Sequence, residues 1–173
     1  MTGCGLSFVQ EALPQRRIKM SERAKGHRLR RGRFSETGRA YHVTTTTHDR
    51  TPLFRDWRVG RLVAHSLRHL QNQGRAETLA FVVMPDHLHW LLVLGNAPSL
   101  SVLMHSLKGF SGKQVRQALD SSGPIWQRGF HDHALRRDED VRVVARYIVA
   151  NPLRAGLVAD IGHYPLWDAA WLL

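Results

Sequence analysis

The stretch VVMPDHLHWLLVL (residues 82–94) decides the fold, because two apolar segments meet here at a short turn. The first segment extends back to residue 78 and is expected to form a strand over residues 78–84, rich in β-branched residues. Pro85 and Asp86 supply the turn, and residues 87–94 return as a second strand. The sequence therefore predicts a β-hairpin whose two strands are nearly uninterrupted in their apolar character.

Two histidines interrupt the returning strand, separated by a single leucine. Residues i and i+2 of a strand face the same way, so His87 and His89 share one face, while Leu88 and Trp90 enter the core on the other. Two imidazoles about 7 Å apart along a strand can converge on one divalent ion. The pattern is also compatible with two surface histidines at the start of a strand.

The remaining elements follow from hydrophobic periodicity and turn residues. In the first expected helix the apolar positions Trp57, Leu62, Val63, Leu67 and Leu70 repeat at helical spacing, and in the second Leu103, Leu107, Phe110 and Val115 form the inner side. We expect a strand at 40–48, a helix at 55–73, a helix from Ser99 or Ser101 to about 119, a strand within 124–136, and a helix at 139–150 capped by Asp138.

This order, strand–helix–strand–strand–helix–strand, predicts an α+β fold of the ferredoxin-like βαββαβ type. The expected architecture is an antiparallel sheet with helices on one face, followed by an additional C-terminal helix. That helix should stop near Asn151, because the residue before Pro152 disfavours helical geometry. The tail at 153–173 is expected to pack back as short turns.

Charge is the most informative property of the composition. Lys and Arg number 25 against 14 Asp and Glu, a net charge of +11 over 173 residues with a pI near 11.1. Such an excess favours a polyanionic partner, nucleic acid above all, with a membrane surface or an RNA scaffold as the alternative. The single cysteine excludes an internal disulfide and suits the cytoplasm, and no apolar run is long enough to span a membrane.

The charge is concentrated near the N-terminus. We expect residues 1–38 to form a basic arm, densest in HRLRRGR (27–33), and residues 39–173 to form one folded domain. The arm either remains solvated or becomes ordered against phosphates.

A further ligand could come from ARYIVANPLRAGLV (145–158) in the last helix. Tyr147 and Asn151 are four residues apart and so lie on one helix face, where they present a hydroxyl and an amide oxygen. Taken alone, Tyr147 could equally be a packed aromatic, and Asn151 a residue that stops the helix before proline.

Three segments in order, VVMPDHLHWLLVL, IWQRGFHDHALR (125–136) and ARYIVANPLRAGLV, resemble the HUH-type single-tyrosine transposases, most closely the REP-associated tyrosine transposases. The similarity extends from Leu29 to Leu173. It implies that His87 and His89 bind a metal, that Tyr147 is the nucleophile, and that Asn151 is the third ligand. Many relatives carry a longer glutamine at the last position, so the third ligand departs from their pattern.

The resemblance also implies the chemistry and the substrate. A phenol with a pKa near 10 is a poor nucleophile, and a divalent ion, Mg²⁺ or Mn²⁺, can polarise the scissile phosphate. The expected reaction is nicking and rejoining of single-stranded DNA at a palindromic-repeat hairpin through a 5′-phosphotyrosine, by a monomer or a homodimer. The candidate DNA contacts are Arg30, Arg31 and Arg33 of the arm and Lys108, Lys113 and Arg116 of the second helix.

Two other functions remain compatible with the sequence. One is a hairpin-binding module of ferredoxin-like fold without catalysis. The other is a metal-dependent hydrolase that activates water at the histidines without using the tyrosine.

Overall fold

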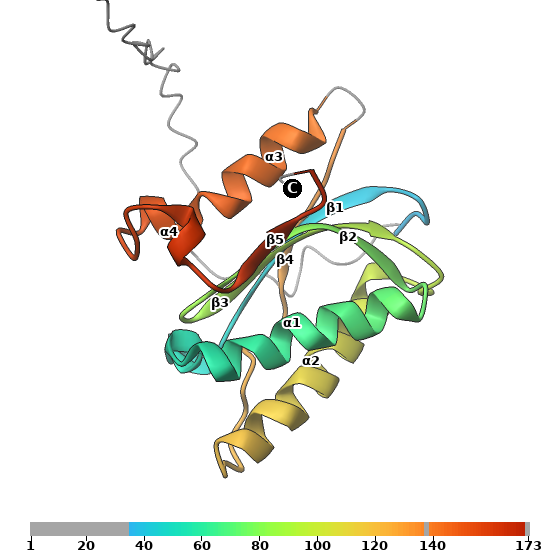
Figure 1. The fold of residues 1–173 in the computed structure, drawn as a ribbon. Coiled ribbons are helices and arrows are strands. Elements are labelled where there is room, and N and C mark those ends of the chain that lie inside the picture. Colours follow the sequence, from blue (N-terminus) through green and yellow to red (C-terminus); the bar gives the residue numbers. More distant parts are fainter. Residues whose placement is uncertain (1–34, 137–138, 172–173) are drawn as a thin grey trace, which may run out of the picture.

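The computed structural model describes residues 35–136 and 139–171, which form a five-stranded antiparallel sheet with helices on both faces (Figure 1). The strand order across the sheet is β4-β1-β3-β2-β5. The elements are β1 Ala40–Thr46, α1 Trp57–Asn72, β2 Ala76–Met84, β3 His87–Leu94, α2 Leu100–Ala118, β4 His131–Ala134, α3 Val141–Val149, α4 Asn151–Arg154 and β5 Trp167–Ala169, with 3-10 turns η1 His48–Arg50, η2 Leu53–Arg55 and η3 Ile161–His163.

The mixed α and β architecture expected from the sequence is confirmed. The central hairpin is formed by β2 and β3, with Met84 paired to His87 across the turn, and β3 has the expected bounds. Strand β1 pairs with the other side of β3 and places Thr46 opposite His87. The start of β3 therefore lies in the middle of the sheet, between β1 and β2.

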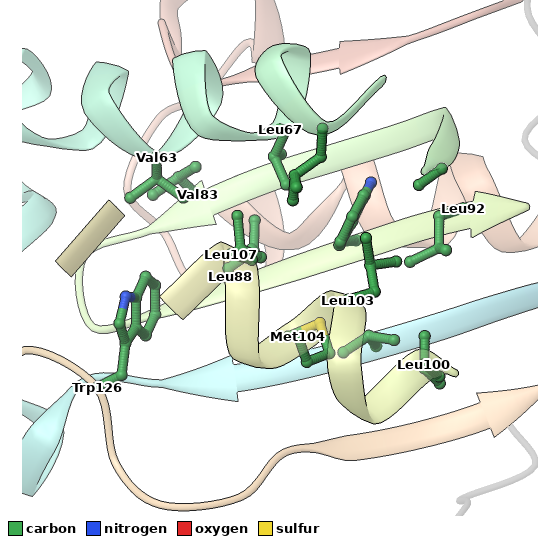
Figure 2. Packing of buried hydrophobic residues seen from close by; sticks show 14 of the residues in the cluster. Val63, Leu67, Val83, Leu88, Leu92, Leu100, Leu103, Met104, Leu107 and Trp126 are labelled. Carbon is green, nitrogen blue, oxygen red and sulfur yellow. The ribbon is translucent and has the colours of Figure 1, made fainter. Parts of the chain in front are cut away.

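Helices α1 and α2 cover one face of the sheet, and α3 covers the other (Figure 1). The even-numbered residues of β3 point toward α1 and α2, because successive side chains of a strand point to opposite faces of the sheet. Trp90 is fully buried on that side, and its indole Nε1 donates to Thr78 Oγ1 at 3.2 Å. Figure 2 shows this core, in which Val63 and Leu67 of α1 and Leu103 and Leu107 of α2 pack on Leu88 and Leu92.

A second, smaller core lies between α3 and the opposite face of the sheet. Helix α3 contributes Ala145, Ile148 and Val149, which pack on residues of β2 and on Leu91 of β3. Leu91 shares its face with His87 and His89, so α3 and the histidines lie on the same side of the sheet. This arrangement places α3 on the face of the sheet that carries the histidine pair.

Two apolar side chains, Trp57 and Phe110, are partly exposed, although the sequence pattern placed them among the inner positions of the two helices. Trp57 is 42% exposed at the start of α1, and Phe110 is 37% exposed on α2, where its ring stacks on His69 at 4.6 Å between centroids. Trp57 lies six residues before Val63, which is about 120° away from it around an α-helix. The helix prediction was right, but Trp57 does not face the core.

The C-terminal region differs from the prediction in two respects. Helix α3 begins at Val141 and is capped by Asp140, whose side chain accepts from Arg142 N, whereas the predicted cap, Asp138, lies outside the described residues. The tail forms α4 and a fifth strand, β5, in place of turns alone. The expected interruption before Pro152 is confirmed, since α3 ends at Val149. Pro152 lies in the first turn of α4, where a backbone N–H has no partner within the helix, so the missing N–H of proline costs no hydrogen bond.

Candidate active site

The two histidines at the start of β3 lie side by side. Their Nε2 atoms are 3.2 Å apart, and the rings meet edge to face with centroids 4.8 Å apart. Two nitrogens this close could both bind one divalent ion, since bonds from such ions to imidazole nitrogens are about 2.1 Å long. The pair therefore has the spacing that two imidazoles need to share one divalent ion.

The other ring nitrogens are held by neighbouring side chains. His87 Nδ1 lies 2.6 Å from Asp86 Oδ1, and because a carboxylate only accepts, Nδ1 carries the proton and Nε2 keeps its lone pair. His89 Nδ1 lies 3.0 Å from Thr44 Oγ1 and 3.2 Å from His42 Nε2. A hydroxyl donates or accepts, so Thr44 suits either tautomer of His89. Such contacts orient metal-binding imidazoles.

Burial favours the neutral form of His89 and of His42. Desolvation, together with the nearby His87, His42 and Arg154, lowers the pKa of His89 to about 3. Burial and the proximity of His133 lower the pKa of His42 to about 4. The neutral ring is the form that binds metals, so His89 is ready to bind without first losing a proton.

Arg154 connects the expected nucleophile to the expected third ligand. Its guanidinium carbon lies 3.9 Å from the centre of the Tyr147 ring, and its Nη2 donates to Asn151 Oδ1 at 2.8 Å. The same charge is the smallest of those that lower the pKa of His89. Tyr147 is 56% exposed, so substrate can reach its side chain.

The amide of Asn151 is fixed by the helix junction. Its Nδ2 donates to Ile148 O at 2.7 Å, which directs Oδ1 toward Arg154. Among the residues that the structure describes, no group of three or more His, Cys, Asp or Glu side chains could hold a metal ion. Asn151 Oδ1, the third ligand that the family resemblance implies, accepts from Arg154 Nη2 at 2.8 Å, and its role as a metal ligand stays a prediction.

Trp126 and Gln127, which form the WQ segment, support the site from the side of β1. Gln127 N donates to Thr46 O, and the Gln127 and Thr46 side chains are hydrogen-bonded at 2.9 Å, next to the start of β3. Trp126 is buried, and its Nε1 donates to Ser111 Oγ at 3.0 Å. His133, on β4, is paired with Glu139 at 2.9 Å.

The candidate DNA-binding residues lie in different surroundings. Lys108 Nζ donates to the carbonyls of Gln127 and Gly129, so it supports the WQ segment from α2. Lys113 and Arg116 lie on the following turns of α2, toward its C-terminal end. Their role in DNA binding stays a prediction. Arg30, Arg31 and Arg33, with most of the expected arm, lie outside the described residues.

Asp86, Thr44, His42 and Arg154 are the site residues that the sequence did not single out. His42 and Thr44 alternate on β1 as His87 and His89 do on β3, and this alternation is a usable signal. The pairing that places Thr44 opposite His89 depends on the sheet register, which the sequence does not state. Arg154 lies seven residues after Tyr147, which is two helical turns.

The match to a family model settles the class of protein. Residues 36–151 match the model described as "Transposase IS200 like", so the chain belongs to the family of IS200-like transposases. The family resemblance read from the three motifs is confirmed.

Individual relatives narrow the similarity further. The REP-associated tyrosine transposase of Escherichia coli K12 is 30% identical over 107 residues, 61% of this chain and 61% of that protein. A Haemophilus influenzae protein is 33% identical over 100 residues, 51% of this chain and 56% of its own. The matches thus span less than two thirds of the length of either relative.

A solved structure is similar over most of the chain. The structure of a REP-associated tyrosine transposase bound to a REP hairpin superimposes with a TM-score of 0.63 at 25% identity, covering 86% of this chain and 82% of the other. Within the described residues, none of the helices is both long enough and apolar enough to cross a membrane.

Proposed function

We propose that this protein cuts and rejoins single-stranded DNA at palindromic-repeat hairpins, with Tyr147 as the nucleophile. His87 and His89 hold a divalent ion, Mg²⁺ or Mn²⁺, with Asn151 as the third ligand. The observation that carries the proposal is the 3.2 Å separation of the two Nε2 atoms, on the face of the sheet that α3 covers. Family membership and a relative named as a REP-associated tyrosine transposase support it.

The substrate class is inferred from the similar structure and from charge. The related transposase is bound to a REP hairpin, and a net charge of +11 favours DNA. An exposed tyrosine on a helix can reach the phosphate of an unpaired, flexible strand more readily than that of a regular duplex. Hairpin DNA with single-stranded flanks is therefore the expected substrate.

The chemistry is a transesterification. The Tyr147 oxygen attacks the scissile phosphorus and loses its proton, the bond to the 3′ oxygen breaks, and that oxygen leaves as a hydroxyl. The 5′ end remains joined to the tyrosine, and attack by another 3′-hydroxyl reverses the step without ATP. A bound ion supplies positive charge that offsets the charge developing on the phosphate oxygens. Asp86 and Thr44 hold the imidazoles in place, and Arg154 holds the tyrosine ring.

The decisive experiment detects the covalent intermediate. Labelled hairpin DNA with single-stranded flanks is incubated with the protein and Mn²⁺ and run on a denaturing gel. The wild type should form an adduct, and Tyr147→Phe should form none while binding the hairpin as before. Tyr164→Phe is the matched control and should still form the adduct, because Tyr164 donates to Val83 O inside the fold.

The other outcomes identify the alternatives. Cleavage without an adduct would indicate a hydrolase that uses water, and binding without cleavage would indicate a binding module. An adduct that persists in Tyr147→Phe would refute the nucleophile. His87→Ala and His89→Ala should each abolish cleavage that depends on added metal, and unchanged cleavage would refute the metal site.

A further inference from the structure

An exposed tryptophan at the start of α1 is flanked by two arginines. The Cζ atoms of Arg58 and Arg61 lie 5.5 Å and 5.4 Å from the centre of the Trp57 ring, and Trp57 is 42% exposed. An accessible aromatic ring beside guanidinium groups provides both a stacking surface for a base and charges for the adjoining phosphates. This combination occurs on the helix that the proposed chemistry does not use.

The start of α1 lies at the same end of the sheet as the histidine pair. The chain before the helix wraps around the Pro85–Asp86 turn: Thr47 N donates to Asp86 O at 2.8 Å, and Phe54 N donates to Pro85 O at 3.0 Å. Arg50 from this segment pairs with Asp86 at 3.3 Å, and Asp86 also accepts from His87. Basic residues thus continue from the edge of the candidate active site, through Arg50, toward α1.

The basic surface continues along α1. Arg58, Arg61, His65 and Arg68 follow one another at intervals of three, four and three residues, which aligns them on one face over about 15 Å. That length corresponds to roughly four stacked nucleotides at about 3.4 Å each. Three of the four, together with Gln71, form one wall of a cleft of about 410 Å³ whose other wall is the segment around β5.

The carboxylates near this surface are engaged with the backbone. Asp56 caps α1 by accepting from Arg58 N at 2.9 Å, and Asp168, on the opposite wall of the cleft, accepts from Ala169 N at 2.8 Å. Neither is ion-paired in the structure with the arginines of the α1 face. The α1 face therefore carries a net positive charge.

We infer that this α1 surface, formed by Trp57, Arg58, Arg61, His65 and Arg68, binds the single-stranded DNA segment that flanks the hairpin. The inference rests on the proposed function, because it assigns a path to the strand that leaves the active site around the Pro85–Asp86 turn. Single-stranded DNA is the occupant because its bases are free to stack on Trp57, whereas the bases of a duplex stem are already stacked on one another.

The test compares hairpins with and without a flanking strand. Binding is measured by fluorescence anisotropy in metal-free buffer with a blunt hairpin and with hairpins that carry a 5′ or a 3′ tail. Arg58→Gln/Arg61→Gln should lose about tenfold in affinity for a tailed hairpin, and the slope of log K against log salt should fall by about 1.4, the value for two single-strand phosphate contacts. Binding of the blunt hairpin should not change.

The stacking role of Trp57 is tested separately. Trp57→Ala should weaken binding of the tailed hairpin by about tenfold, and Trp57→Phe should restore most of the loss, because a phenyl ring also stacks on a base. A tail containing 5-iododeoxyuridine should photocrosslink to Trp57, which mass spectrometry of the tryptic peptides would identify. Thermal unfolding followed by circular dichroism verifies that each variant is folded.

Arg39→Gln is the matched charge control. Arg39 precedes β1 at the end of the sheet opposite His87, and its ion pair with Glu36 is an exposed one at 3.7 Å. Its substitution should leave the difference between tailed and blunt hairpins intact. Equal losses for tailed and blunt hairpins in the α1 variants would mean that α1 binds the stem, and wild-type affinity for both would mean that it binds neither. Either result overturns the inference.

Adduct formation by the same proteins and hairpins tests the proposed function separately. If wild-type protein forms no adduct with any tailed hairpin in Mn²⁺, the catalytic proposal fails whatever the α1 variants do. If the adduct forms and the α1 variants bind like the wild type, only the inference about α1 fails.

Discussion

At the scale of single residues, the site depends on side chains that fix the histidine rings. The tautomer of His87 follows from Asp86, because a carboxylate 2.6 Å from Nδ1 must accept a hydrogen bond. The sequence places Asp86 directly before His87, but only the turn geometry aims its side chain at the imidazole. The histidines themselves were predictable, since alternation along a strand is a local property.

Removing this carboxylate should weaken metal binding without removing a ligand. Asp86→Ala should lower the affinity for Mn²⁺ by roughly ten- to a hundredfold, because His87 is then free to rotate or to change tautomer. Titration of free Mn²⁺ by electron paramagnetic resonance measures this without DNA. Asp49→Asn serves as the control, because it neutralises an exposed carboxylate paired with His48 and should bind Mn²⁺ like the wild type. Wild-type affinity in Asp86→Ala would exclude an orienting role.

At the scale of elements, the tail after α4 secures the outer side of β2. Tyr164 is partly buried, and its hydroxyl donates to Val83 O at 2.7 Å, while Val83 N donates to Leu166 O. Strand β5 then pairs with β2. This region was missed because a three-residue strand has no periodicity to detect, whereas β3 has eight residues of continuous pattern and was predicted to its ends.

The same tyrosine should make stability sensitive to alkaline pH. Burial raises the pKa of Tyr164 to about 12 from an ordinary value of 10, so the folded protein favours the neutral phenol. The stabilisation is complete below pH 10 and is lost as the pH rises from 10 toward 12. Urea unfolding across this range should show a steeper loss for the wild type than for Tyr164→Phe, which has no titrating hydroxyl. Identical pH dependence would contradict the shift.

Tyr164→Phe also removes a hydrogen bond to a backbone carbonyl. At neutral pH it should lower the free energy of unfolding by about 1 kcal/mol, the usual net value of such a bond. The same urea titrations at pH 7 provide this value.

At the scale of the whole molecule, basic residues are divided between residues 1–33, which the structure does not describe, and the folded domain. Composition alone predicted a polyanionic partner, but it could not say which surfaces of the fold carry the charge. That depends on how α1 is oriented on the sheet, which follows from long-range packing of Val63 and Leu67 against β2 and β3.

Deletion of residues 1–33 tests the arm. The deleted segment contains nine Lys or Arg residues and should weaken hairpin binding while reducing the steepness of its salt dependence, because fewer counterions are then released. Anisotropy titrations at several salt concentrations measure both quantities, and the family match from residue 36 onward indicates that the domain is retained. An unchanged slope would show that the arm makes no phosphate contact.

The margins of the sheet have a consequence for self-association. Its two outermost strands contain only four and three residues, and backbone bonds from Gln127, Leu135 and Ala170 occupy positions beyond their ends on β1 and β2. In the described part of the chain, a neighbouring molecule therefore finds only short open ladders of amides and carbonyls on which to add a strand. If two copies assemble, we expect side chains of the helices and loops to make more of the contact than the edges of the sheet.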